Sequence, residues 1–255
     1  MEVVRVWIVI FRYSRHLLVA LFMNLSKILA SDTVRNPSPS NLLRKVRRSF
    51  WRLTTKGFNC GWHITRYAMY NHLRSVCDGI VSPDSRVLSI SRSQPLIDTV
   101  GLPSSAIVNA DYPEHNMLSL DFADASFDCV VSDQVLEHLE GDPQVGIDEC
   151  HRVLRPGGVA IHTTCFMNPI HGNPSYSSDQ YSDFWRFTPL ALALLHRKWT
   201  QTIDINGWGN LRALNFTNDG NKYCGIPHAK WHPVHKMAVQ NDPLWPMVTW
   251  IVAQK

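Results

Sequence analysis

Phe127-Asp-Cys-Val-Val-Ser-Asp-Gln-Val-Leu-Glu-His-Leu139 is the stretch that decides the fold class, because it begins with the β-branched, apolar run of a buried strand, 127–132. Residues 143–154 follow with apolar side chains at helical spacing, and Pro156-Gly-Gly158 ends that pattern. A further apolar run extends from Gly158 to Thr164. Strand, helix and strand in this order predict parallel strands with a helix packed on the sheet.

The same alternation extends in both directions along the chain. Short apolar runs predict strands, and a helix begins where Thr188 can cap it and Pro189 takes its first position. The predicted strands are 87–91, 106–111, 202–205 and 248–253, and the predicted helices are 94–100 and 190–197. An α/β fold with a doubly wound, mostly parallel sheet follows. Such sheets bind ligands at the carboxyl ends of their strands, which draws attention to Ser91, Asp111 and Asp133.

Two linked motifs carry a family resemblance. The segment 127–139, followed by Glu149-Cys-His-Arg-Val-Leu-Arg-Pro-Gly-Gly158, resembles the motifs "sFDvV.s..vLEH" and "E..RVLkPGG". These motifs are typical of class I S-adenosylmethionine-dependent methyltransferases of the type 11 group. The resemblance covers roughly residues 80–255. It implies a Rossmann-like sheet of seven strands with an antiparallel last strand at 248–253, and S-adenosylmethionine as the cofactor.

The resemblance also implies which residues hold the cofactor. Asp111 lies 20 residues beyond Ser91, where a carboxylate ending the second strand accepts the ribose hydroxyls. Asn116 takes the place of the family's adenine-facing Asp or Asn, and Met117 is expected to pack on the adenine ring. The other strand-end residues expected beside the cofactor are Tyr112, Asp133 and Gln134.

The first motif departs from the family pattern. Where the family has roughly "vLDiGcGtG", this chain has Val87-Leu-Ser-Ile-Ser-Arg-Ser-Gln-Pro95, without a glycine and with Ser89 in place of the usual Asp. Side chains crowd the approach of backbone to cofactor and disfavour left-handed positions. One interpretation is a divergent, working turn in which Ser91, Arg92 and Ser93 face the cofactor tail. The other is a methyltransferase-like scaffold without catalysis, serving as a binding or membrane-docked partner.

A substrate side is expected after the strand that ends at Thr164. Residues 165–174 and 183–189 resemble a "piH..P.DyWRfTp" segment of type 11 members that accompany glycan or glycolipid synthesis. His171 is the candidate base for a hydroxyl proton, and Asp183 is its orienter or a second candidate. The alternative for His171 is a histidine that only packs the loop.

Trp185 and Arg186 belong to the same segment and are expected to line the substrate pocket, because their side chains stack on rings and grip polar groups. The predicted reaction is therefore O-methylation of a small molecule, a sugar or a lipid-linked glycan. Methylation on nitrogen or carbon stays open at this point.

The N-terminal extension is set apart by its charge. Residues 1–53 hold ten Lys/Arg against two Asp/Glu, whereas the remaining 202 residues hold 15 against 19. A basic helix is predicted at 42–53, after a breaker-rich linker at 36–40. The apolar segment 3–29 is interrupted by charges, and its uncharged runs are too short to span a bilayer. A packed or membrane-surface helix is favoured over a signal peptide.

Residues 54–255 form the predicted methyltransferase domain, with a long insertion at about 209–245 that is expected to be a lid or a dimer contact. The acidic balance of this domain argues against a nucleic-acid partner. The six cysteines show no CxxC pair and no clustered ligand spacing. We therefore expect free thiols and no metal site. The expected location is cytoplasmic, either free or at the membrane surface through residues 1–53.

Overall fold

The computed structural model describes residues 39–102, 106–172 and 182–255. It divides into two compact units, of which the first is Met1–Ile64 with Arg212–Val239 and the second is Thr65–Leu211 with Gln240–Lys255. This division differs from the expected domain boundary at residue 53. The apolar segment 3–29 lies outside the described residues.

The second unit is built on a six-stranded sheet in the order β3-β2-β4-β5-β8-β6. Its strands are β2 (Val87–Ile90), β3 (Ile107–Ala110), β4 (Phe127–Asp133), β5 (Leu154–Cys165), β6 (Gln201–Trp208) and β8 (Val248–Gln254). The first four in the order are parallel, and β8 is antiparallel to both of its neighbours. The predicted doubly wound, mostly parallel sheet is confirmed, with six strands in the described residues where the resemblance implied seven.

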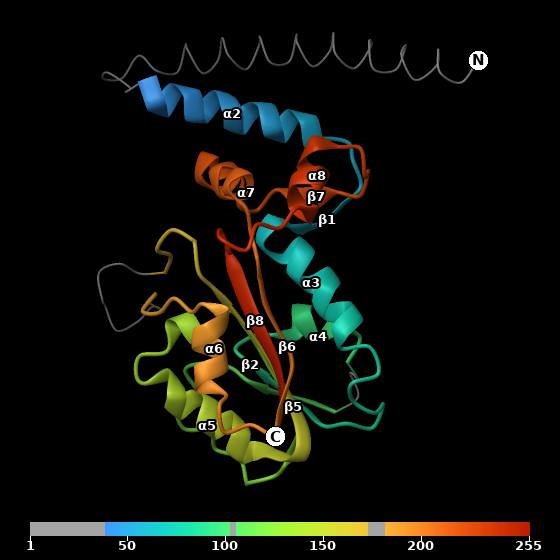
Figure 1. Ribbon diagram of the computed structural model, residues 1–255, viewed down its shortest axis with the longest axis vertical. Helices are drawn as coiled ribbons and strands as arrows, with labels where there is room; N and C mark the ends of the chain where they lie inside the picture. The colour runs from blue at the N-terminus through green and yellow to red at the C-terminus, as the bar shows by residue number, and fades with distance from the viewer. Residues whose placement is uncertain (1–38, 103–105, 173–181) are drawn as a thin grey trace, which may run out of the picture. The chain divides into compact units, whose positions relative to one another are not determined.

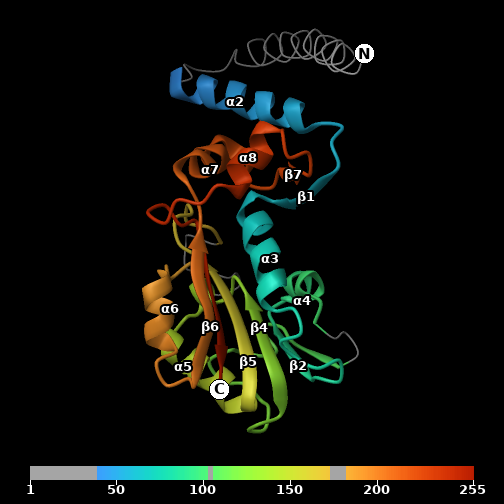
Figure 2. The same ribbon diagram turned by 45° about the vertical axis from the view of Figure 1, so that its right-hand side comes forward.

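Helices cover both faces of this sheet. They are α3 (Ile64–Val76), α4 (Gln94–Val100), α5 (Pro143–Val153) and α6 (Pro189–Leu195). Figure 2 shows α5 and α6 together on one side of the sheet and α4 on the other. Side-chain caps start two of them: Thr188 accepts a hydrogen bond from the N–H of Ala191, as expected, and Asp142 accepts one from the N–H of Gln144.

The segment between α5 and the buried part of β5 depends on two glycines. Gly157 has a φ of +79°, which favours glycine. A Cβ on Gly158 would lie 2.9 Å from the carbonyl oxygen of Arg155 and 3.1 Å from that of Asp128, too close for any side chain. The chain can therefore turn back beside β4, and from Val159 to Cys165 every residue of β5 is buried. Continuous burial is expected of a strand covered on both faces.

The first unit joins residues 39–64 to 212–239. Its elements are α2 (Pro39–Thr55), β1 (Cys60–His63), α7 (Leu211–Phe216), η2 (Thr217–Asn221), β7 (Gly225–Pro227) and α8 (Pro233–Val239) (Figure 1). Strands β1 and β7 pair in an antiparallel manner. The Trp51 ring packs edge-on against Phe216 at a centroid distance of 5.7 Å, and Arg47 pairs with the buried Asp219 at 2.8 Å.

One expectation for this part of the chain needs correction. The helix α2 begins at Pro39, inside the segment 36–40 that was expected to be a linker, because proline is accepted in the first turn of a helix. The expected insertion at 209–245 contributes residues 212–239 to this unit, where they are grouped with 39–64, and its role as a lid or a dimer contact stays a prediction. Among the described helices, none has the length and apolar composition needed to cross a membrane.

Candidate active site

The turn that follows β2 has a glycine-like backbone although it contains no glycine. Ser91 and Arg92 have φ angles of 48° and 62°, in the left-handed region. The N–H of Ser91 donates to the carbonyl of Ala110 at 3.0 Å, and the Ser93 hydroxyl donates to the carbonyl of Ile90. Backbone that is held in such a sparsely populated conformation is typical of functional sites.

Asp111 follows β3 and is joined to this turn. Its Oδ1 accepts a hydrogen bond from the backbone N–H of Arg92 at 2.9 Å. Among the contacts of the described residues, Oδ2 has no hydrogen-bond partner, and the residue is half-buried. A carboxylate oxygen in this position can accept the hydroxyl groups of a ligand. We call residues 91–93 together with Asp111 the cofactor turn.

S-adenosylmethionine fits the cofactor turn at two points. Oδ2 of Asp111 can accept the ribose hydroxyls, as the resemblance implies. The side chain of Arg92 is exposed and forms no ion pair within the described part of the chain, so it can reach the carboxylate of the amino-acid tail. The residues present are thus compatible with the cofactor despite the missing glycines.

Asp133, the third expected strand end, is enclosed by other side chains. Its Oδ2 accepts from Arg66 Nε at 3.1 Å and from the Tyr70 hydroxyl at 2.6 Å, and its Oδ1 accepts from the Thr163 hydroxyl. The carboxylate side chain is only 8% exposed. The structure therefore assigns Asp133 a set of internal partners in place of the expected contact with cofactor.

Arg66 and Tyr70 were missed by the sequence analysis. They lie four residues apart on α3, and this spacing indicates that they share one face of the helix. Burial and the neighbouring Asp133 carboxylate raise the pKa of Tyr70 above its usual value, so the hydroxyl stays protonated and donates. Nothing local in the sequence indicates that this face meets the end of β4.

Two further residues that were predicted to contact the cofactor are open to solvent. The Tyr112 side chain is 60% exposed, next to Asp111. Asn116 is also exposed, and its Oδ1 accepts a hydrogen bond from the N–H of Leu118 at 2.9 Å. Its amide nitrogen can still donate to an adenine edge.

The other three residues that were predicted to contact the cofactor face the protein: Met117, Ser89 and Gln134. Met117 is 3% exposed and lies in the hydrophobic core, where a flexible thioether fills space well; its contact with adenine stays a prediction. Ser89 is fully buried within β2, and its hydroxyl has no partner in the described residues. Gln134 donates from its side chain to the Thr163 hydroxyl at 3.2 Å.

The loop after β5 brings His171 and Asp183 together. Oδ2 of Asp183 lies 3.0 Å from Nδ1 of His171 and accepts the backbone N–H of His171 at 2.9 Å. The Asp183 side chain is fully buried, whereas 25% of the His171 side chain is exposed. This is the arrangement of a histidine whose ring is oriented by a carboxylate.

Arg186 completes this group. Its guanidinium pairs with both carboxylate oxygens of Asp183. Burial acts to raise the pKa of Asp183, but the hydrogen bonds from Arg186 and from the backbone N–H of His171, together with the charges of Arg186 and His171, outweigh it and hold this pKa below its usual value. Asp183 is therefore charged at neutral pH, and Arg186 is a partner of Asp183 rather than a group open to substrate.

Trp185 lies at the edge of the same loop. Its ring nitrogen donates to the carbonyl of Leu139 at 2.8 Å, and its ring stacks on Phe187 at a centroid distance of 6.3 Å. The side chain is 39% exposed, so one part of it packs the loop while the rest can line a pocket.

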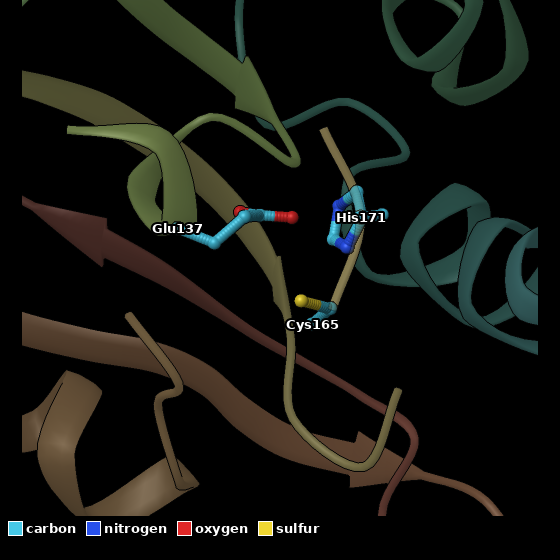
Figure 3. Close-up of side chains that lie close together, drawn as sticks. All are labelled: Glu137, Cys165 and His171. Atoms are coloured by element: carbon cyan, nitrogen blue, oxygen red, sulfur yellow. The ribbon is translucent and has the colours of Figure 1, made fainter. Parts of the chain in front are cut away.

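Glu137 and Cys165 meet His171 in a second group that the sequence analysis missed (Figure 3). One potential ligand atom from each of the three side chains lies within 4.8 Å of the other two. Glu137 comes from the 3₁₀ turn η1 (Leu136–His138) and Cys165 from the end of β5. We call Glu137, Cys165, His171, Asp183 and Arg186 the acceptor cluster.

Comparisons with known proteins agree with the resemblance. A family model described as a methyltransferase domain of the type 11 group matches residues 74–162. Over 64 residues the chain is 47% identical to a Mycolicibacterium smegmatis protein named "Probable S-adenosylmethionine-dependent methyltransferase", covering 23% of this chain and 24% of that protein. Over 78 residues it is 35% identical to an uncharacterized 37.1 kDa protein of a Streptomyces fradiae transposon, covering 31% and 22%. The chain thus spans less than a quarter of the length of these curated relatives.

Solved structures with a similar arrangement are more distant in sequence. An S-adenosylmethionine-dependent methyltransferase from Archaeoglobus fulgidus is 12% identical, with 80% of this chain and 99% of that chain covered and a TM-score of 0.46. The 1,6-didemethyltoxoflavin N1-methyltransferase of Burkholderia thailandensis is 14% identical, with coverage of 87% and 92% and a TM-score of 0.45.

Proposed function

Residues 74–162 belong to the type 11 group of S-adenosylmethionine-dependent methyltransferases, and from this premise we propose that the chain methylates a hydroxyl group of a small molecule, a sugar or a lipid-linked glycan. The observation that carries the proposal is the cofactor turn, in which the left-handed backbone at Ser91 and Arg92 is hydrogen-bonded to Asp111. These features keep the backbone path of a glycine-containing turn at the place where the resemblance expects the cofactor, which supports cofactor binding.

The cofactor turn and the acceptor cluster lie along the same edge of the sheet and have different proposed roles. The cofactor turn follows β2 and β3, while the acceptor cluster follows β4 and β5, which lie next to them in the strand order. Ligands of doubly wound sheets bind at this carboxyl edge. The arrangement supports a cofactor held over the first pair of strands and an acceptor held over the second pair.

Bound S-adenosylmethionine would supply a methyl group on a positively charged sulfur atom. Its transfer to a hydroxyl oxygen releases one proton, and the protein must take up that proton and hold the two reactants in line. In the proposal the acceptor hydroxyl is activated at His171, whose ring Asp183 orients from a distance of 3.0 Å. Arg186 keeps Asp183 charged throughout, so the orienting contact persists.

The choice of a hydroxyl acceptor rests on this pair. An alcohol is a poor nucleophile until its proton is removed, so an oriented imidazole at the acceptor side is useful for it. The partly exposed Trp185 ring beside the pair offers a flat, apolar surface of the kind that packs against sugar rings. A nearby aromatic surface and an oriented base together favour a sugar or a related polyol.

Calorimetric titration with S-adenosylhomocysteine tests the proposal. The wild-type chain is expected to bind with a micromolar dissociation constant, and Asp111→Ala should remove measurable binding. Asp84→Ala is the matched control, because Asp84 is an exposed carboxylate before β2, at the opposite end of the same strand. If a folded wild-type chain does not bind, the scaffold interpretation replaces the enzyme.

We also propose that residues 1–53 bring the chain to an anionic membrane surface from the cytoplasmic side, where S-adenosylmethionine is made. Arg44, Arg48 and Arg52 are exposed on α2, and the basic balance of this segment supports the proposal. Co-sedimentation with phosphatidylserine vesicles should exceed that with phosphatidylcholine vesicles and should fall at high salt. A triple Arg→Glu variant at these positions that still sediments equally would contradict it.

A further inference from the structure

We propose that Glu137, Cys165 and His171 bind a zinc ion. One potential ligand atom from each of these side chains lies within 4.8 Å of the other two. Figure 3 shows the three side chains pointing toward a common space, from η1, the end of β5 and the following loop. Zinc ligands lie about 2.0–2.3 Å from the ion, so small movements of these side chains would bring them into range.

An independent observation points to a missing ligand at Glu137. This carboxylate is fully buried, and its Oε1 has no hydrogen-bond partner in the described residues. Its Oε2 accepts a hydrogen bond from the Thr164 hydroxyl at 2.8 Å, which fixes the orientation of the group. A buried carboxylate oxygen without a partner is strongly unfavourable unless a proton or a cation meets it.

The surroundings of His171 are those of a metal-binding histidine. Oδ2 of Asp183 lies 3.0 Å from Nδ1 of the His171 ring, so a carboxylate stands beside the imidazole. Arg186 pairs with both oxygens of Asp183 and fixes it in turn. Carboxylate–histidine contacts of this kind are the usual outer partners of a metal-binding imidazole.

The ligand atoms of these three side chains favour zinc over other common ions. A thiolate, an imidazole and a carboxylate are all ligands that zinc accepts, while Mg²⁺ and Ca²⁺ prefer oxygen alone. The charges also balance: with the thiolate formed, Glu137, Cys165 and Asp183 carry three negative charges, which Arg186 and a divalent ion neutralise.

Three protein ligands leave a fourth position open, as in catalytic rather than structural zinc sites. Cys165 and Glu137 are buried, so the open position faces the side of the partly exposed His171. This consequence rests on the proposed function: Glu137, Cys165 and His171 would hold the ion, and the ion would supply positive charge that makes a hydroxyl at the open position easier to deprotonate.

The full-length chain, freed of metal with a chelator and titrated with Co²⁺ as a spectroscopic substitute for zinc, tests the site. One equivalent is expected to produce the intense visible bands of a tetrahedral ion and a thiolate-to-cobalt charge-transfer band in the near ultraviolet. Zinc should displace the cobalt with one-to-one stoichiometry. Metal analysis of the chain purified without a chelator should show about one zinc per chain.

Variants assign the ligands. Cys165→Ser should abolish the charge-transfer band, and the isosteric Glu137→Gln should weaken Co²⁺ binding at least 100-fold. Asp183→Asn should weaken it about 10- to 100-fold, as removal of an outer partner does. Cys60→Ser is the matched control, because Cys60 is a half-buried free thiol in the other unit. The Co²⁺ bands of this variant should equal those of the wild type.

Two results would overturn the inference: a folded wild-type chain that binds no Co²⁺, or bands that persist unchanged in Cys165→Ser and Glu137→Gln. Titration with S-adenosylhomocysteine on the same samples shows whether each variant is folded. Binding of that ligand without metal binding would reject the zinc site and leave the proposed methyltransferase in place. Metal binding without binding of S-adenosylhomocysteine would support the zinc site and reject the proposed methyltransferase.

Discussion

The cofactor turn and the acceptor cluster occupy neighbouring strand ends, yet they are held in different ways. The cofactor turn is fixed by backbone hydrogen bonds, and its side chains are largely open: Arg92 is exposed and Asp111 is half-buried. The acceptor cluster is fixed by side chains that bind one another, with Glu137, Cys165 and the Asp183 side chain buried. A sequence can therefore change its side chains at the turn while the backbone path persists, whereas the cluster depends on the identity of each member.

The largest effect is expected where the cluster's internal pairing is broken. Arg186→Ala leaves Asp183 buried and without its cation, so the free energy of unfolding should fall by about 3–5 kcal/mol. Urea denaturation measures this change. The matched variant Arg155→Ala breaks an ion pair with Asp128 whose side chains are 49% and 28% exposed, and it should lose less than about 1 kcal/mol. Equal losses of stability would contradict the prediction that the buried Arg186–Asp183 pair contributes more than the exposed Arg155–Asp128 pair.

The Asp183 carboxylate is also expected to make the free energy of unfolding depend on pH. Because the pKa of Asp183 is lower in the folded chain than in the unfolded chain, its contribution to stability is complete above the ordinary carboxyl range and is lost as pH falls through the lowered value. Urea denaturation between about pH 6 and pH 3 should show a smaller loss of stability in Asp183→Asn than in the wild type. Parallel curves for the two proteins would argue against this interpretation.

Tyr70→Phe tests Asp133, which ends β4 and lies between the cofactor turn and the acceptor cluster in the strand order. The variant removes the 2.6 Å hydrogen bond to Asp133 and keeps the ring in place. A hydrogen bond to a charged group contributes about 1.5–3 kcal/mol, and thermal or urea unfolding should report a loss in this range. Tyr223→Phe is the control, since the Tyr223 side chain is 78% exposed and its loss should be close to zero. A neutral Tyr70→Phe would mean that Asp133 is open to a ligand after all.

The smallest expected effect is at the cofactor turn. Ser91→Gly removes a Cβ from a residue with φ of 48°, which should raise the free energy of unfolding by about 0.5–1 kcal/mol after the flexibility of glycine is counted. S-adenosylhomocysteine should bind at least as tightly as before, because the backbone can approach more closely. Calorimetry measures the affinity, and urea denaturation measures the stability.

Ala125→Gly is the matched control for this variant, because Ala125 has a similar φ of 50° in another loop. It should show the same gain in stability with no change in affinity. If Ser91→Gly weakens the binding of S-adenosylhomocysteine and Ala125→Gly does not, the Ser91 hydroxyl itself contacts the ligand and the turn acts through its side chains.

Much of the sheet could be predicted because its signals are local. Apolar runs placed the strands of the second unit to within a few residues, and Thr188 caps α6 as expected. The spacing of Asp111 from Ser91 predicted that the two strand ends meet, and the hydrogen bond from Arg92 joins them. The burial of Met117 in the core could not be predicted, because a methionine near a predicted site and a methionine in the core have the same local pattern.

The sequence by itself determined the alternation of strands and helices in the sheet unit, the start of α6 at Thr188 and the positions of the strand ends, because each follows from the spacing of residues close together in the chain. Only the tertiary structure decided that Arg66 and Tyr70 enclose Asp133, that residues 212–239 pack with 39–64, and that Glu137, Cys165 and His171 share one space. These contacts join elements far apart in sequence, and which faces meet is set by the packing of the whole sheet and its helices.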